Sequence, residues 1–233
     1  MKRIVVIGAG ELGSRHIQGI AASNLDLIIE VVEPNERSKK IAEERYNQIK
    51  EKFFNKEIVF FDSIKDLSTD IDVAIVATNA NIRFEIVEKL LQTKKVKNLI
   101  LEKVLFQKIA DYYSTEELLK ESGTKCWVNH PRRMFPFYKE LKKELKEAKQ
   151  VFYNFHGGDW GIGCNSLHFI DHLAYLVDST DLKLENNFLD DGFYKSKREN
   201  FVEFSGHLVG NISDHKFSLF SFKDKSPFSL TIN

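Results

Sequence analysis

Residues 2–13 read KRIVVIGAGELG, and this stretch decides the fold of the first half of the chain. The run Lys2–Ile7 ends in consecutive aliphatic residues, which is typical of a strand buried on both faces of a parallel sheet. Gly8, Gly10 and Gly13 follow in the spacing G-x-G-x-x-G, and Ser14–Ser23 then has a helical pattern. A strand, this turn and a helix in direct succession form the context in which the spacing binds a dinucleotide.

Each glycine of the turn has its own physical role in that motif. Gly8 permits the tight turn, Gly10 lets a pyrophosphate approach the backbone, and Gly13 lets the helix pack closely on the strand. The N-terminus of the helix that follows offers N–H groups and a partial positive charge to phosphates, and Glu11 and Leu12 of the turn belong to the expected cofactor site. We therefore expect Gly8 to Gly13 to bind the cofactor. The alternative is a glycine turn in an α/β domain without a ligand.

An acidic residue about 20 positions after the glycines completes the motif, and Glu33 ends the second β-rich run at that place. Its carboxylate would accept hydrogen bonds from a ribose and repel a 2′-phosphate, which favours NAD over NADP. Arg37, four residues later, would attract a 2′-phosphate and also belongs to the expected cofactor site.

The first half continues as strands alternating with helices. Such alternation predicts an α/β fold, a doubly wound parallel sheet covered by helices on both faces. The predicted strands after the first are Leu27–Val32, Ile58–Phe61, Val73–Ala77, Asn98–Leu101 and Lys125–Val128. The predicted helices after the first are Glu36–Phe54, a short turn from Ser63, Arg83–Gln92, and Ser114–Glu121 with Ser114 as its cap.

The second half changes to one α+β domain with a mostly antiparallel open sheet. Its predicted helices are Phe137–Lys149 and Asn165–Val177, and its predicted strands are Val151–Phe155 and, beyond Leu182, Phe201–Phe204, Leu208–Ile212, Lys216–Phe222 and Phe228–Ile232. We place the domains at 1–128 and 129–233. The final run reaches Asn233, so we expect a C-terminal domain that is short or truncated.

Composition and charge exclude several classes. The 233 residues carry 34 basic and 34 acidic side chains, without the basic excess of a nucleic-acid binder. No apolar stretch approaches the roughly 20 residues that span a bilayer, and the apolar run at the N-terminus is too short for a signal peptide. Two cysteines, Cys126 and Cys164, predict a reducing, cytoplasmic compartment.

Several later segments resemble the Gfo/Idh/MocA family, which includes glucose–fructose oxidoreductase and inositol dehydrogenase. Ala74–Asn79 resembles the strand and turn under the nicotinamide, and Glu102-Lys103-Val104 resembles the family's Glu-Lys-Pro motif. Asn129 with Arg132–Pro136 resembles the entry into the substrate domain, and Gly161–Asp171 resembles the catalytic segment ending in His-x-x-Asp. The matches follow the family's order from residue 3 to about residue 178.

The resemblance implies a Rossmann domain that binds NAD(P), with Thr78, Asn79, Glu102 and Lys103 at the cofactor. It implies hydride transfer between nicotinamide and a hydroxyl or carbonyl carbon of a small molecule, a sugar, nucleotide-sugar or polyol. It also implies that the open sheet mediates oligomers. An uncovered, phenylalanine-rich sheet face needs a partner, so we expect a homodimer or homotetramer.

The expected catalytic residues are Lys103, His168 and Asp171. Lys103 would polarise the reacting oxygen, and His168 would move its proton, because an imidazole is the side chain that ordinarily exchanges protons near neutrality. Asp171 would orient His168 or bind a second hydroxyl. The spacing of His168, Asp171 and His172 predicts that all three project from one helical face.

Four positions depart from the family's pattern: Cys164 replaces an aspartate, Ser166 a glycine, Arg83 a histidine, and Val104 the proline after Lys103. Because a cis bond before a non-proline residue costs about 2.5–4 kcal/mol, we expect a trans bond at Val104. The departures leave a second hypothesis, a catalytically silent NAD-binding regulatory or assembly protein.

Other chemistries are less well supported. Cys164, His168 and His172 recur every four positions and would suit a metal, but we expect Cys164 to precede the helix, so we predict no metal site. The serine-hydrolase elbow Gly-x-Ser-x-Gly and the Walker lysine are both missing from the sequence.

Overall fold

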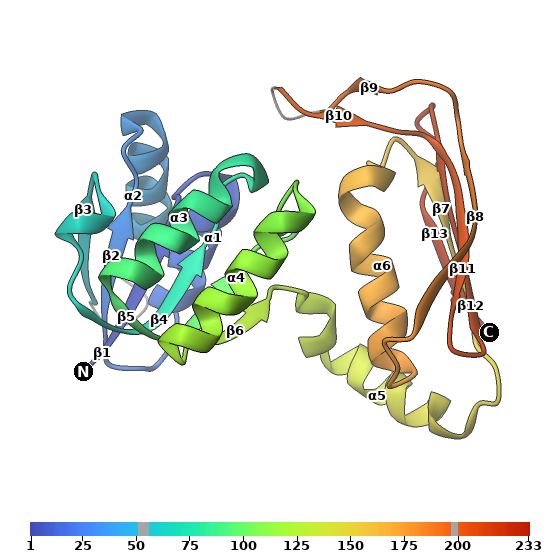
Figure 1. Ribbon diagram of the computed structural model, residues 1–233, viewed down its shortest axis with the longest axis horizontal. Coiled ribbons are helices and arrows are strands. Elements are labelled where there is room, and N and C mark those ends of the chain that lie inside the picture. Colours follow the sequence, from blue (N-terminus) through green and yellow to red (C-terminus); the bar gives the residue numbers. More distant parts are fainter. Residues whose placement is uncertain (51–55, 197–199) are drawn as a thin grey trace. The chain divides into compact units, whose positions relative to one another are not determined.

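The computed structural model describes residues 1–50, 56–196 and 200–233. The chain divides into two compact units, Met1–Asn129 and His130–Asn233, which are described in turn (Figure 1).

The first unit is built on a six-stranded parallel sheet in the order β3-β2-β1-β4-β5-β6. Its strands are β1 (Lys2–Ile7), β2 (Leu27–Val32), β3 (Glu57–Phe61), β4 (Asp70–Val76), β5 (Lys95–Leu101) and β6 (Lys125–Val128). The strand order reverses direction between β1 and β4, and in such sheets ligands bind beyond the carboxyl ends of the strands at this switch point. The predicted doubly wound α/β fold is confirmed.

Helices cover both faces of this sheet. They are α1 (Glu11–Ala21), α2 (Glu36–Lys50), α3 (Ala80–Thr93) and α4 (Ile109–Ser122), with a 3₁₀ turn at Ile64–Asp66. Alternation along β1 shows the two-sided burial, because Val6 packs with Ile17 of α1 whereas Val5 packs with Val87 of α3. All of these side chains are fully buried.

Three helices of this unit begin earlier than expected, and one of them is α3, which begins at Ala80 rather than at Arg83. α1 begins at Glu11, directly after Gly10, rather than at Ser14, so Gly13 lies within its first turn. α4 begins at Ile109, so Ser114 lies inside the helix and Lys108 occupies the cap position. The added turn of α4 is held by Tyr112, whose ring packs edge-on against buried Phe106 at 5.2 Å between centroids. The end of the predicted helix Glu36–Phe54 lies outside the described residues.

The second unit is an α+β unit with a five-stranded sheet in the order β13-β7-β12-β11-β8. Its elements are a 3₁₀ turn (Pro131–Met134), α5 (Pro136–Glu144), a second 3₁₀ turn (Leu145–Glu147), β7 (Phe152–Gly158), α6 (Ile162–Leu176), β8 (Leu182–Leu189), β9 (Tyr194–Lys195), β10 (Val202–Glu203), β11 (Gly206–Ile212), β12 (His215–Phe222) and β13 (Ser229–Ile232). The sheet is mostly antiparallel, as predicted, but β7 and β12 run parallel.

Two further expectations for this unit are wrong in detail. The single helix predicted over Phe137–Lys149 ends at Glu144 and continues as a 3₁₀ turn. The strand predicted at Phe201–Phe204 is the short β10, which pairs with β9 in a separate ribbon instead of joining the main sheet.

One face of the second sheet packs against α6. Along β12, Phe217 and Leu219 are buried in a cluster with Leu173 of α6, whereas Phe220 and Phe222 point to the opposite face. Among the described residues, we find no helix with the length and apolar character needed to cross a membrane.

Candidate functional site

The glycine turn has the geometry that the motif requires. Gly8 has a φ of +88°, and a Cβ there would lie 3.0 Å from Cγ2 of Thr78. A Cβ on Gly13 would lie 1.7 Å from the carbonyl oxygen of Gly8, so only glycine permits this approach of α1 to the turn. A Cβ on Gly10 would meet nothing within 4 Å. Packing within the described chain therefore does not explain Gly10, whereas the approach of a ligand does.

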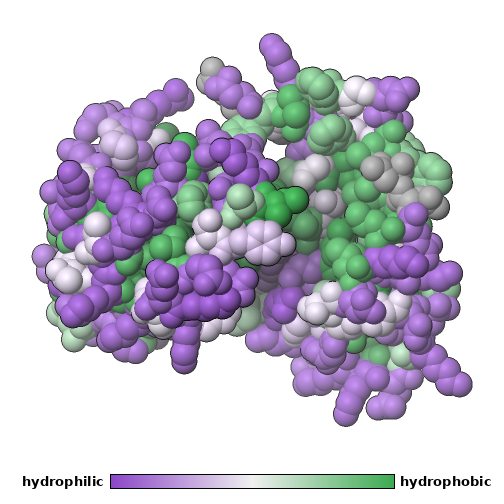
Figure 2. Space-filling view, in the orientation of Figure 1, coloured by the Kyte–Doolittle hydropathy of each residue, from purple (hydrophilic) through white to green (hydrophobic). Residues whose placement is uncertain are grey.

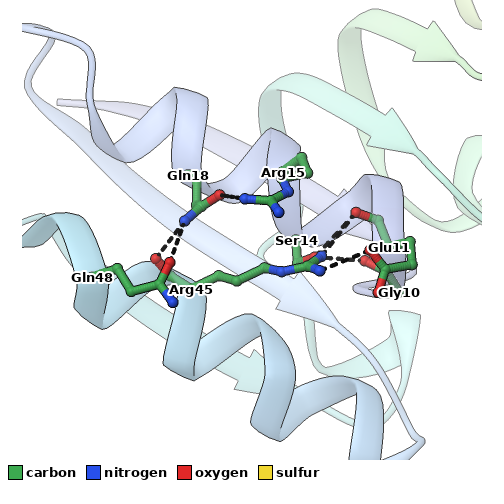
Figure 3. A network of polar contacts seen from close by, with 7 residues as sticks. All are labelled: Gly10, Glu11, Ser14, Arg15, Gln18, Arg45 and Gln48. Carbon is green, nitrogen blue, oxygen red and sulfur yellow. Dashed lines mark hydrogen bonds and ion pairs between the residues drawn. The ribbon is translucent and has the colours of Figure 1, made fainter.

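The first turn of α1 is fastened to α2 by Arg45 (Figure 3). The Arg45 guanidinium donates to the Glu11 carboxylate at 2.7 Å and to Oγ of Ser14 at 2.5 Å. Ser14 in turn donates to the carbonyl oxygen of Gly10 at 2.7 Å. The Glu11 side chain thus points to Arg45, and what Glu11 and Leu12 offer a cofactor is their backbone. Gly10 caps α1 without a side-chain hydrogen bond, which suits an anion at these N–H groups.

Glu33 lies beside the same turn, directly after β2. Its Oε2 accepts a hydrogen bond from the N–H of Ala9 at 2.7 Å, and its Oε1 accepts one from Asn35 at 2.9 Å. Each carboxylate oxygen has two lone pairs, so Glu33 keeps acceptor capacity for a ribose. Arg37, in the first turn of α2, is exposed. Glu33 also anchors the glycine turn through Ala9, a role that the sequence spacing did not reveal.

The turn after β4 places Thr78 against Gly8 and Asn79 at the cap of α3. Within the described part of the chain, the buried Oγ1 of Thr78 has no hydrogen-bond partner. A buried hydroxyl without a partner is costly, and a ligand group at this turn would satisfy it. Gly10 and Thr78 together show that this unit fits a dinucleotide.

Buried Arg83 holds the segment that carries Lys103. From α3 it donates to the carbonyl oxygens of Glu102 and Leu105, both at 2.8 Å, and also to those of Val104 and Thr78. The sequence marked Arg83 only as a departure from the family, so this role was missed. The Lys103–Val104 peptide bond is cis, which corrects the trans expectation, and Lys103 itself is 7% exposed. The carbonyl groups on both sides of this bond are those that Arg83 binds.

Glu102 is buried and links three elements. Its Oε1 lies 2.7 Å from Nε2 of His16 on α1 and accepts from Nδ2 of Asn129 at 2.7 Å. Burial by itself raises the pKa of Glu102, but the hydrogen bonds from His16 and Asn129 outweigh it, and the pKa is lowered. The Glu102 side chain therefore positions the strand end that precedes Lys103.

In the second unit, a pocket of about 610 Å³ lies against α6. The pocket is lined by Arg132, Tyr138, Phe155, Asp159, Trp160, Asn165, His168, Phe169, Phe228 and Leu230. Figure 2 shows hydrophobic surface gathering over the part of this unit that holds the start of α6. The lining combines an aromatic floor with polar groups that include His168, as expected of a small-molecule site.

The three α6 residues of the predicted trio, His168, Asp171 and His172, have different surroundings. The Asp171 carboxylate is held by a two-pronged ion pair with Arg133, at 2.9 Å from Nε to Oδ2 and 2.5 Å from Nη2 to Oδ1. His172 is fully buried and its Nδ1 lies 2.9 Å from the hydroxyl of Tyr153. Burial, helped by the charge of Arg132, lowers the pKa of His172 to about 4. His172 is a neutral core residue because α6 packs against β7 at this position.

The start of α6 is capped by Glu203 of β10, another residue that the sequence did not single out. Its carboxylate accepts from the N–H groups of Gly163 at 2.9 Å and Cys164 at 3.2 Å. Cys164 thus lies in the first turn of α6, not before it as expected. Among residues 1–50, 56–196 and 200–233, no group of three or more histidine, cysteine or acidic side chains is arranged to hold a metal ion.

Comparisons with known proteins agree with this architecture. The structure resembles a myo-inositol dehydrogenase from Lactobacillus casei solved with NAD(H) and myo-inositol, at 15% identity and a TM-score of 0.70, over 100% of this chain and 70% of that one. It also resembles the dehydrogenase MviM from Clostridium difficile, at 18% identity and a TM-score of 0.70, over 99% and 74% of the two chains. A third similar structure is the dehydrogenase WlbA from Thermus thermophilus, solved with NAD and α-ketoglutarate, at 18% identity and a TM-score of 0.63, over 96% and 74%.

These identities are low, so the structural likenesses speak for the fold alone. A search of curated proteins finds no match. Residues 2–130 match the model of the oxidoreductase family with an NAD-binding Rossmann fold, Gfo/Idh/MocA. Because this match covers more than half of the chain, the protein belongs to the Gfo/Idh/MocA family of oxidoreductases, and its first unit is that family's NAD-binding Rossmann fold.

Proposed function

We propose that the protein is an NAD-dependent dehydrogenase or reductase acting on a hydroxyl or carbonyl carbon of a sugar, nucleotide-sugar or polyol. The observation that carries this proposal is the glycine turn. It leaves open space at Gly10, beside a helix start without a side-chain cap and the acceptor Glu33. The first unit would bind the cofactor, and the second would bind the substrate and mediate assembly.

The choice of NAD over NADP rests on Glu33. A carboxylate fixed by two backbone N–H groups at the end of β2 would accept from a ribose hydroxyl and repel a 2′-phosphate. Arg37 is the opposing influence. Replacing Glu33 with alanine should therefore weaken NAD binding and favour NADP relative to NAD.

The reaction needs groups that hold the reacting oxygen and move its proton. Bound NAD would supply the hydride acceptor or donor. Lys103, whose segment is held by Arg83, would donate to the substrate oxygen and stabilise developing negative charge. His168 would take the hydroxyl proton during oxidation and return it during reduction. Asp171, fixed by Arg133, would orient His168 or bind a second hydroxyl.

Cofactor binding is tested by replacing Gly10 with valine and titrating NAD in a calorimeter. A Cβ added at Gly10 meets no atom of the described chain within 4 Å, so we expect the variant to fold and yet to lose NAD affinity. Gly19→Ala on the same helix, where a Cβ also meets nothing within 4 Å, is the control and should bind normally. Unchanged affinity in folded Gly10→Val would remove the assignment of this turn to the cofactor.

The catalytic roles are tested by nicotinamide absorbance with a panel of sugars, nucleotide-sugars and polyols. His168→Ala should lower turnover about 10²–10⁴-fold with little effect on NAD affinity, and Lys103→Ala should do likewise. Near-normal turnover in both variants would mean that these roles are wrong.

The second hypothesis, a catalytically silent NAD-binding protein, is favoured by Cys164 at the position where the family often has an aspartate. Tight NAD binding without turnover on any member of the panel would support it.

We also propose assembly through the face of the second sheet opposite α6. Phe152 and Phe188 are 44% and 60% exposed there, and Phe220 and Phe222 lie on the same face. A second copy would cover these rings, so light scattering should show a homodimer or homotetramer at micromolar concentration. A monomeric mass would contradict this.

A further inference from the structure

Three aromatic side chains, Phe155, Trp160 and Phe169, pack together in the lining of the pocket of the second unit and form its aromatic floor, and Arg132 lies over one of them. The rings of Phe155 and Phe169 are stacked with centroids 3.8 Å apart, and Trp160 packs edge-on against Phe169 at 5.3 Å. The guanidinium carbon of Arg132 lies 4.6 Å from the centroid of the Phe169 ring. An arginine held over an aromatic ring keeps its donors available in the plane of the guanidinium.

The neighbouring Arg133, unlike Arg132, has a carboxylate partner within the part of the chain that the structure describes. Arg133 is bound by both oxygens of the Asp171 carboxylate, whereas the Arg132 guanidinium has no hydrogen-bonded carboxylate within the described residues. The acidic residue that shares the pocket lining, Asp159, accepts a hydrogen bond from the Tyr194 hydroxyl at 3.1 Å. Arg132 is therefore a cation of the pocket that has no acidic partner among residues 1–50, 56–196 and 200–233.

His172, on which the charge of Arg132 acts, supplies no anion. His172 is neutral at physiological pH, since burial and Arg132 hold its pKa at about 4. The pocket volume of about 610 Å³ lies within the range of sites for small organic ligands. A substrate carboxylate or phosphate would form the paired, charge-assisted hydrogen bonds for which a planar guanidinium is suited.

We infer that this pocket selects a polyhydroxylated substrate that carries an anionic group, a carboxylate or a phosphate, and that Arg132 binds this group. The inference deepens the proposed function and rests on it for the reaction at His168. The aromatic floor would pack against the C–H face of the sugar, while Arg132 fixes its orientation through the charged end. Neutral sugars would then be weaker ligands of the pocket.

The test measures binding without turnover, through the fluorescence of Trp160 in the pocket. The chain has only two tryptophans, and Trp127 lies in the first unit at 52% exposure, so Trp127→Phe leaves Trp160 as the reporter. In this background, D-glucuronate, glucose 6-phosphate and neutral glucose are titrated with NAD present. At least one of the two anions should bind about tenfold or more tightly than glucose, and comparing them distinguishes carboxylate from phosphate.

Arg132→Gln should weaken binding of the preferred anion about 10- to 100-fold and leave glucose binding nearly unchanged. Arg132→Lys, which keeps the charge but loses the planar fork, should fall between the two and covers the case in which the glutamine variant does not fold. Lys139→Gln removes a charge from an exposed position on α5 outside the pocket and should bind like the parent.

Equal binding of glucose and both anions, no binding of either anion, or unchanged anion affinity after Arg132 is replaced would overturn the inference. Arg132-dependent anion binding without any hydride transfer would leave the inference standing and count against the proposed function. Turnover restricted to neutral sugars would support the proposed function and overturn the inference.

Discussion

Replacing Arg83 with methionine should destabilise the first unit, because this side chain is the shared donor for two loops. Arg83 is 2% exposed and binds four carbonyl oxygens, those of Thr78, Glu102, Val104 and Leu105. Leaving a buried acceptor without a partner costs about 1–3 kcal/mol. Since water would reach some of these carbonyls, the lower value applies, and the four together give a loss of about 4 kcal/mol.

The assay is urea unfolding of the first unit, followed by Trp127 fluorescence in a Trp160→Phe background. Arg83→Lys is the matched variant, because an ammonium retains the charge but cannot reach four carbonyls at once, and it should recover about half of the loss. Amide exchange measured by mass spectrometry should also accelerate at residues 102–105 in Arg83→Met. A loss below about 1 kcal/mol with unchanged exchange would refute the reasoning that Arg83 holds the Lys103 segment.

Three further outcomes follow from single contacts. Gly13→Ala should destabilise by about 3 kcal/mol and abolish NAD binding because its Cβ would meet the backbone of Gly8, whereas Gly19→Ala should be neutral or slightly stabilising by thermal unfolding; equal melting temperatures would contradict this. Glu203→Gln should lower the free energy of unfolding of the second unit by about 1–2 kcal/mol, because one of the two side-chain oxygens no longer accepts at the start of α6. Unfolding is followed by Trp160 fluorescence, and a change below about 0.3 kcal/mol would count against the capping role of Glu203. The pKa of His172 is about 4 in the folded protein and about 6.5 in the unfolded chain, so the unfolded chain takes up the proton first as the pH falls. The free energy of unfolding should therefore decrease by up to about 3 kcal/mol as the pH drops from about 6.5 to about 4. His172→Gln should flatten that part of the stability profile, and an unchanged slope would show that another group is responsible.

The residues of each segment alone were sufficient to predict the architecture of the first unit and the conformation of the glycine turn. An aliphatic run such as Ile4–Ile7 has two apolar faces, and only a sheet covered on both sides buries both of them. The conformations of Gly8 and Gly13 follow from steric limits that apply wherever a strand turns into a helix at this spacing. The strand boundaries of β1, β2 and β6 agree with those predicted because each is fixed by its own residues.

What the sequence left open depends on partners distant along the chain. Glu203 reaches the start of α6 from 39 or 40 residues away, and Arg83 reaches carbonyl groups 19 to 22 residues away. The parallel pairing of β7 with β12 is likewise a long-range choice that the alternation within each strand does not encode. Periodicity placed His172 with His168 and Asp171, but only the packing of α6 against Tyr153 made it a neutral core residue. Sequence pattern determines which faces are apolar and which turns are sterically possible, whereas the pairing of buried polar groups requires the three-dimensional neighbours that tertiary structure supplies.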